Sequence, residues 1–301
     1  MLSKIRWSLL VISFIVLTYG VYLFGVKINN GFELPTFAYP INQEGLVRGS
    51  CYNLAHTGEW FTQNLAAGKM NVIITFIAGN LLLIFLLGRS FCGFICPFGF
   101  IQDLLDKFRQ MLRLKSFRWT EKQYKWVSLF KWEFLAIFLG LTYLGISFCS
   151  FCPIIAIVPP LAGREINVTI SGILAVIVMA GAFLKRRFWC NICPMGLLVG
   201  LFYKVSLFRL KKDCQACTEC GACYEACPMG IKSIYTERQK SDITTMDCLM
   251  CAECINKCPE KNALSLAVAR WKIFSSSRSN FFADQGLKAE NTVKQNIDKL
   301  F

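Results

Sequence analysis

Long apolar runs, separated by short basic segments, dominate the first two-thirds of the chain. A helix needs roughly 20 apolar residues to cross the hydrocarbon layer of a membrane. Four runs are long enough and free of charged residues, so the pattern predicts a mainly α fold with a domain of four transmembrane helices. These runs cover residues 7–26, 70–88, 134–163 and 166–184.

A fifth apolar run, residues 188–203, is shorter and contains Pro194. Because proline interrupts a helix, we expect this run to be interfacial or re-entrant rather than membrane-crossing. Hydrophobic residues make up 54% of the chain and the mean hydropathy is +0.45, which is more apolar than an ordinary soluble domain. Composition therefore agrees with a membrane protein.

Basic residues predict the orientation of the four helices, because Lys and Arg gather in cytoplasmic loops. Lys4 and Arg6 precede the first run, a basic loop that starts at Arg89 follows the second, and residues 185–187 follow the fourth. We therefore expect a multi-pass protein of the cytoplasmic (inner) membrane with both termini in the cytoplasm. The basic residues of these cytoplasmic segments account for most of the net charge of +14, so no nucleic-acid partner is expected.

One cysteine pattern, C-x2-C-x2-C-x3-C-P, occurs twice after the apolar region. It is the ligand pattern of a two-cluster bacterial ferredoxin, where three cysteines of each run bind one [4Fe–4S] cluster and the fourth binds the other. We therefore predict a small α+β ferredoxin domain with two [4Fe–4S] clusters on the cytoplasmic side. The ligands are Cys217, Cys220, Cys223 and Cys258 for one cluster, and Cys248, Cys251, Cys254 and Cys227 for the other.

A zinc site or a set of disulfides is the alternative interpretation of these eight cysteines. Zinc needs only four ligands and does not require two crossed runs. Disulfides need an oxidising compartment, whereas the expected orientation puts this segment in the cytoplasm. Iron–sulfur binding is therefore favoured.

Two further cysteine pairs, each followed by proline, stand at the expected cytoplasmic ends of apolar runs. Residues 89–99 read RSFCGFICPFG and residues 187–196 read RFWCNICPMG, so the chain repeats one hairpin. Proline ends a regular helix and redirects the preceding thiolates. We predict a third iron–sulfur cluster or a metal ion here, while the alternative is four small apolar core residues. The cysteines concerned are Cys92, Cys96, Cys190 and Cys193.

A third pair, Cys149 and Cys152, lies at the expected outer end of the third run. With Cys51 and His56 of the long outer loop it could form a four-ligand site for a further centre. The alternatives are a disulfide in an oxidising outer compartment and a solvated His56. His56 is the only histidine, which excludes a haem held by two helix histidines, and no C-x-x-C-H motif for covalent haem occurs. No catalytic residues are predicted.

The paired hairpins and the two ferredoxin runs resemble those of polyferredoxin membrane proteins of the NapH, NosR and CcoG type, over roughly residues 70–269. Three departures stand out: the second hairpin has C-x2-C-P where such proteins often have C-x3-C-P, an outer cysteine pair is added, and the outer loop has no room for a flavin-binding domain of the NosR kind. The departures argue against a specific nitrate or nitrous-oxide role and leave the electron-carrier class intact.

The resemblance implies a membrane-anchored iron–sulfur protein that moves electrons between a cytoplasmic or quinol donor and an extracytoplasmic redox partner. Its partners would be the membrane and other redox subunits or an extracytoplasmic reductase, as part of an oxidoreductase system rather than a stand-alone enzyme. The alternative is a copper reductase or redox-centre assembly factor of the CcoG type, in which the outer cysteines and His56 capture the metal.

The sequence divides into three parts. Residues 1–211 are predicted to form the transmembrane domain with its cysteine hairpins, and residues 212–269 the two-cluster ferredoxin domain. Residues 270–301, with the stretch SSSRS and scattered charges, are predicted to be a linker or tail.

Overall fold

The structure is a computed structural model, and it describes residues 2–24, 68, 70–117, 119–143, 152–154, 156–157, 170–269, 271–278 and 281. The chain forms two compact units. We call residues 1–9, 85–94 and 200–301 the ferredoxin unit, and residues 10–84 and 95–199 the helical unit. The ferredoxin unit thus includes two short segments that lie far from the cysteine runs in the sequence.

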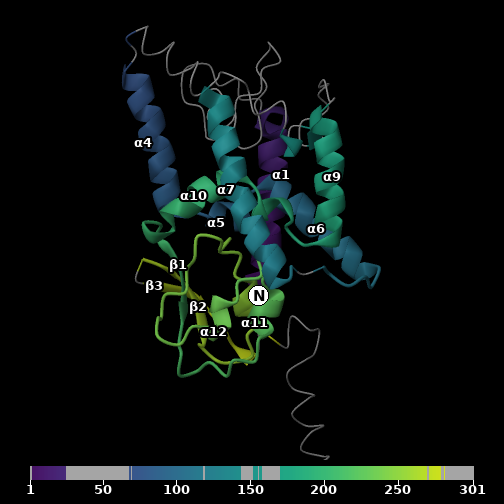
Figure 1. The fold of residues 1–301 in the computed structure, drawn as a ribbon. Coiled ribbons are helices and arrows are strands. Elements are labelled where there is room, and N and C mark those ends of the chain that lie inside the picture. The colour runs from purple at the N-terminus through teal and green to yellow at the C-terminus, as the bar shows by residue number, and fades with distance from the viewer. Residues whose placement is uncertain are drawn as a thin grey trace, which may run out of the picture. The chain divides into compact units, whose positions relative to one another are not determined.

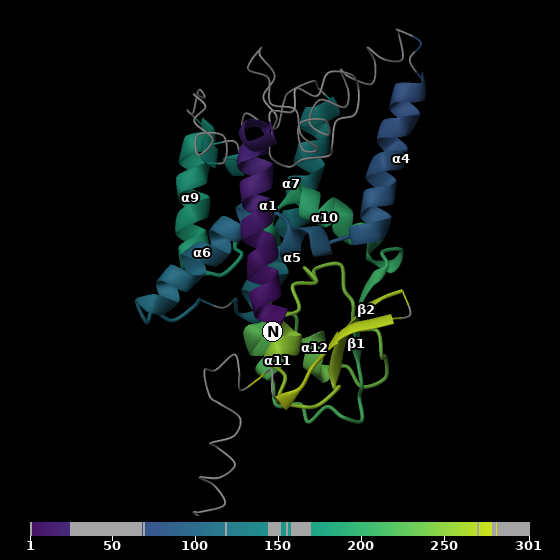
Figure 2. The ribbon, with the colours of Figure 1, turned by 180° about the vertical axis from the view of Figure 1, so that it is seen from behind.

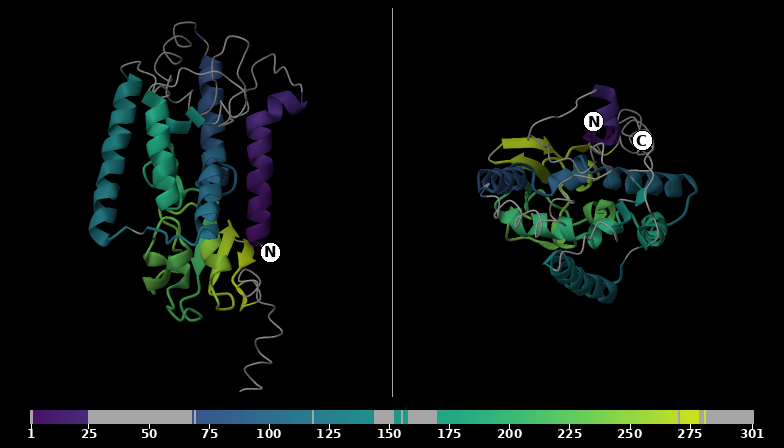
Figure 3. Two further views of the ribbon diagram at one scale, coloured as in Figure 1. Left: turned by 90° about the vertical axis from the view of Figure 1, so that its right-hand side faces the viewer. Right: turned by 90° about the horizontal axis from the view of Figure 1, so that it is seen from above.

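Long helices form the frame of the helical unit. They are α4 (Met70–Leu87), α7 (Glu121–Tyr143), α9 (Ile170–Leu184) and the later part of α1 (Leu2–Phe24). Within this unit they run in roughly one common direction (Figures 1 and 3). Each overlaps one of the four apolar runs, so the prediction of helical structure is confirmed there.

Among the helices of the described residues, none has both the length and the apolar character that a membrane crossing requires.

An amphipathic helix, α6 (Pro97–Met111), packs against α9 (Figure 2). It begins at Pro97, directly after Cys96, and proline suits the first position of a helix because its missing N–H would have no helical partner there. Its buried residues recur at helical spacing and include Gln102, Asp103 and Asp106. The face that α6 buries is therefore unusually polar.

The fifth apolar run is not one continuous helix. It forms η2 (Trp189–Asn191), α10 (Pro194–Leu201) and η3 (Phe202–Lys204), and α10 begins at the proline that interrupts the run. The indole of Trp189 is buried and meets the rings of Phe98 and Phe134 edge to face, at centroid distances of 6.4 and 6.1 Å. This aromatic contact fixes the first part of the run inside the helical unit.

A three-stranded antiparallel sheet supports the ferredoxin unit (Figure 1). Its strands, in spatial order, are β1 (Phe208–Lys212), β2 (Leu264–Val268) and β3 (Trp271–Ser275). Leu210 and Leu266 are buried partners across β1 and β2. Short helices carry the cysteine loops between the strands: α11 (Ala222–Ala226), α12 (Ser233–Thr236) and α13 (Glu253–Asn256), while α5 (Ser90–Phe94) joins from the earlier segment.

Candidate iron–sulfur centres

The eight cysteines of the ferredoxin runs line two cavities. With the adjoining open solvent included, the empty space is about 320 Å³ at the first cavity and about 360 Å³ at the second. Each is lined by three cysteines of one run and the fourth cysteine of the other run, so the structure brings each predicted group of four together. The first cavity has Cys217, Cys220, Cys223 and Cys258, and the second has Cys227, Cys248, Cys251 and Cys254.

The backbone of both cysteine loops bends in the same way. Glu219 and Gly221 have positive φ angles of 56° and 78° in the first loop, and Met250 and Ala252 have 53° and 58° at the matching positions of the second. Left-handed conformation is unfavourable for residues other than glycine, so the loops hold it only because the surrounding structure requires it. The repeated bend turns successive cysteines toward one cavity.

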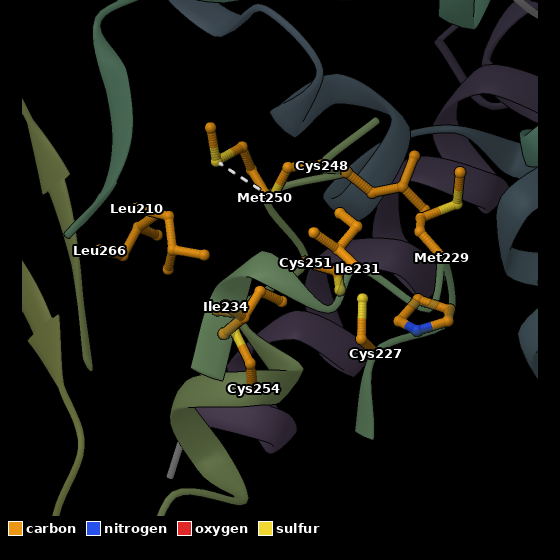
Figure 4. Close-up of a pocket in the computed structure, with 13 residues that line it drawn as sticks. Leu210, Cys227, Met229, Ile231, Ile234, Cys248, Met250, Cys251, Cys254 and Leu266 are labelled. Carbon is orange, nitrogen blue, oxygen red and sulfur yellow. Dashed lines mark hydrogen bonds between the residues drawn. The ribbon is translucent and has the colours of Figure 1, made fainter. Parts of the chain in front are cut away.

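Apolar side chains surround the cysteines of the second cavity (Figure 4). Cys227 and Cys251 point toward one another, with Ile231 and Ile234 beside them (Figure 4). Ile234 is buried and lines both cavities, so one side chain lies between the two groups of ligands. The two centres would therefore be neighbours.

The cavities strongly disfavour thiolates that have no metal. Burial, with the charges of neighbouring cysteines, raises the pKa of Cys223 and of Cys248 to about 12, and raises the pKa of Cys254 well above its ordinary value. Iron binds the thiolate, and its positive charge offsets both the burial and the mutual repulsion of the sulfurs. The donor set of four thiols in each cavity therefore fits a [4Fe–4S] cluster.

Backbone amides also act on the ligands. Burial raises the pKa of Cys227, and hydrogen bonds from the backbone of Ile231, Met229 and Gly230 oppose that rise. Hydrogen bonds to cluster sulfurs are one of the means by which a protein sets a reduction potential. The loop after Pro228 would therefore both hold and tune the second centre.

The hairpin cysteines fall in both units. Cys92 belongs to α5 of the ferredoxin unit, whereas Cys96, Cys190 and Cys193 belong to the helical unit, and all four are partly exposed. Among the described residues, no group of three or more His, Cys, Asp or Glu side chains is placed to hold a single metal ion, either at the hairpins or in the two ferredoxin cavities. A third centre at these four cysteines stays a prediction.

A fully buried ion pair lies beside two of these cysteines in the helical unit. Arg187 donates to Asp103 through Nε and Nη2, at 3.0 and 2.6 Å. Burial lowers the pKa of the Arg187 guanidinium, but the charge and hydrogen bond of Asp103 and the nearby Cys190 and Cys96 outweigh this effect and raise the pKa well above its ordinary value. Arg187 therefore stays charged next to Cys96 and Cys190.

Gln102, which precedes Asp103 in the sequence, contacts the second cysteine hairpin. Its Oε1 accepts a hydrogen bond from the backbone of Trp189 at 3.0 Å, and its Nε2 lies 3.8 Å from the sulfur of Cys190. Sequence reasoning counted the arginines only as topology signals and missed these contacts. The signal was present, since an arginine stands three residues before the first cysteine of each hairpin.

The predicted outer site falls mainly outside the described residues. Cys51, His56 and Cys149 lie there, and only Cys152, which is buried, is described. Binding of a metal at this site stays a prediction. Cys214, which the cysteine pattern leaves unassigned, lines neither cavity.

Comparison with known proteins agrees with this arrangement. A model of a 4Fe-4S binding domain matches residues 70–115 and again residues 168–213, and a model of a 4Fe-4S dicluster domain matches residues 209–259. The first model thus matches both hairpin repeats, and the second contains both ferredoxin runs. These domains define an iron–sulfur protein of the ferredoxin type.

Several relatives cover much of the chain. The uncharacterized protein MJ0749 of Methanocaldococcus jannaschii is 33% identical over 191 residues, which are 62% of this chain and 68% of the relative. The putative electron transport protein YccM of Escherichia coli is 23% identical, over 68% of this chain and 57% of that protein. The ferredoxin-type protein NapH of Haemophilus influenzae is 26% identical, over 66% of this chain and 70% of that protein. No solved structure matches.

The chain belongs to the family of ferredoxin-type electron transport proteins of the NapH and YccM kind. The predicted resemblance to NapH-type proteins is therefore confirmed, as is the prediction of a mainly helical chain with a two-cluster iron–sulfur region near its C-terminus.

Proposed function

We propose that this protein is anchored in the cytoplasmic membrane and moves electrons between a cytoplasmic or quinol donor and an extracytoplasmic redox partner. The observation that carries the proposal is the pair of adjacent cavities, each lined by four cysteines. Two neighbouring one-electron centres suit a protein that relays electrons. They do not require a site for making or breaking bonds in a substrate.

The membrane part of the proposal is supported by apolar side chains on the outside of the long helices. Leu82 on α4, Ile137 on α7 and Val176 on α9 are 58, 56 and 70% exposed. Such extensive exposure of large apolar side chains on one set of helices is unfavourable in water and favourable in lipid. We therefore propose that these helices lie in the membrane, with both termini and the ferredoxin unit in the cytoplasm.

A third centre at Cys92, Cys96, Cys190 and Cys193 is also proposed. Each pair falls inside one of the two matches to a 4Fe-4S binding domain. The charged Arg187 and the amide of Gln102, next to Cys96 and Cys190, would stabilise thiolates or an anionic cluster there. This centre would extend the route from the ferredoxin clusters toward an outer partner.

The residues of the chain would have three tasks in this function. The eight ferredoxin cysteines would hold the clusters, which supply the one-electron chemistry when bound. The apolar lining, with Leu210, Ile231 and Leu266, would exclude water from the second cavity. Ile234 would lie between the two groups of ligands, so that a single side chain separates them.

The test begins with the intact chain, purified anaerobically from membranes. We expect it to stay with the membrane after a carbonate wash and to be released by detergent. Iron and sulfide analysis with an EPR redox titration should reveal two [4Fe–4S] centres and a third signal. Addition of a quinol such as duroquinol tests the donor side. A colourless protein, or one that carbonate removes, contradicts the proposal.

Serine substitution separates the third centre from the other two. Cys92→Ser and Cys193→Ser should each remove the third signal and leave both ferredoxin signals in place. Cys214→Ser is the matched control, since Cys214 lines neither ferredoxin cavity and lies outside both hairpins. An unchanged iron content and EPR spectrum in the hairpin variants would eliminate the third centre without affecting the ferredoxin clusters.

A further inference from the structure

Arg89 is a buried cation beside the second cavity. It is 5% exposed, its Nη1 donates to the carbonyl oxygen of Met246, and it lies 4.0 Å from a carboxylate oxygen of Asp247. Asp247 directly precedes Cys248, the first ligand in the second run. The guanidinium is therefore held at the start of the loop that carries three of the cavity's four cysteines.

The two hairpin repeats have an arginine at the same position, but the two arginines have different surroundings. Arg89 and Arg187 both stand three residues before the first cysteine of their hairpins. Arg187 pairs with Asp103, six residues after Pro97, but the position six residues after Pro194 is Gly200. A Cβ at Gly200 would lie 2.5 Å from the oxygen of Met246 and 3.3 Å from Cδ of Arg89. The ferredoxin loop thus occupies the space next to Arg89 that a side chain at position 200 would fill.

A second arginine fixes the segment of Cys92 against the same loop. Arg6, which is 1% exposed, donates from Nε to the oxygen of Gly93 at 3.2 Å and from Nη1 to Oε1 of Glu253 at 2.5 Å. A Cβ at Gly93 would lie 2.5 Å from the oxygen of Leu249 and 3.1 Å from Cα of Cys251. The residue after Cys92 is therefore in direct contact with the ligand loop of the second cavity.

The first cavity has a different charge environment. Its lining includes Glu219 and Glu260, and the partner of Glu219 is Arg238 on the exposed surface. Among the described residues, none that lines the second cavity is charged, so the nearby guanidinium of Arg89 acts through a medium that screens it little.

We propose that Arg89 raises the reduction potential of the centre in the second cavity relative to that of the centre in the first cavity. The inference depends on the proposed function, since it requires both clusters. Reduction adds one electron and one negative charge to a centre, and a buried cation stabilises that state. One electron passes between the two centres, and no bond or proton changes at Arg89.

Redox titration by EPR of the intact chain tests the proposal, and Cys254→Ser, which keeps the first centre alone, identifies the two signals. We expect Arg89→Gln to lower the reduction potential of the second centre by about 59 mV. For one electron, this corresponds to a roughly tenfold change in the equilibrium constant for electron transfer between the two centres. The first centre should not move. Arg89→Lys should restore most of the shift. The exposed Arg238→Gln is the matched control at the first cavity and should leave the potential of the second centre unchanged.

Several outcomes would overturn the proposal: no shift in Arg89→Gln, an equal shift of both centres, or no restoration by lysine. If Arg89→Gln fails to assemble its clusters, Asp247→Asn provides the alternative test. Removal of the negative charge at Asp247 should raise the reduction potential of the second centre. A fall or no change in that variant contradicts the role of Arg89. Absence of both iron–sulfur signals from the unmutated chain would instead show that the proposed function itself is wrong.

Discussion

The two cysteine cavities have the same ligand pattern and the same bends of the backbone, but their surroundings differ. In the first, Cys223 and Cys258 are buried, but Cys220 and its neighbours Thr218 and Glu219 are exposed. In the second, Cys251 and Cys254 are buried among apolar side chains. Ligand spacing can therefore repeat within one small unit while solvent access and local charge do not, and these are the properties that set a cluster's potential.

The difference also suggests separate tasks for the two cavities. The first cavity would be approached at the exposed Cys220, whereas the second is covered by the segments that carry Arg6 and Arg89. Removal of one feature from one cavity, and of its counterpart from the other, tests whether the two surroundings have different effects.

The largest expected effect comes from the crossed ligands. Cys227→Ser should remove the centre of the second cavity, although Cys227 belongs to the first run, and Cys258→Ser should remove the centre of the first. Iron content and the EPR signal that disappears distinguish the two variants. If Cys227→Ser and Cys220→Ser abolish the same signal, the ligands are not crossed.

The next largest effect concerns the buried ion pair of the second cavity. Arg6→Gln should destabilise the ferredoxin unit by roughly 3 kcal/mol, because it removes the buried cation that pairs with the mostly buried Glu253 carboxylate. Thermal unfolding of the intact protein, followed by loss of iron–sulfur absorbance, measures the change. Its counterpart at the first cavity, the exposed pair of Arg238 and Glu219, should give no measurable change when Arg238 becomes Gln. Equal effects of both substitutions would contradict the comparison.

A smaller effect is expected from the close approach of Gly93 to the second ligand loop. Gly93→Ala places a methyl group 2.5 Å from a backbone oxygen that cannot move freely, so we expect a loss of about 1 to 2 kcal/mol. The thermal midpoint of the intact chain reports it. Gly140→Ala in α7 is the matched control, since nothing lies within 4 Å of a Cβ there. A Gly93 variant as stable as the control would mean that the contact is loose.

The sequence alone determined the class of the protein and the elements that carry its chemistry. The spacing of cysteines and prolines within each run is local information, and it predicted the grouping of eight cysteines that the two cavities display. The apolar runs similarly predicted the long helices, because both patterns depend on residues close together in the chain.

Only the tertiary structure decided what surrounds those ligands. Arg89 and Arg187 were predicted merely as charges that orient the chain, yet both are buried and paired. Arg6 meets Glu253 across 247 positions of sequence, and such a contact depends on how distant segments pack rather than on local spacing. A buried charge needs its partner placed by the whole fold, so no periodicity along the chain can reveal it.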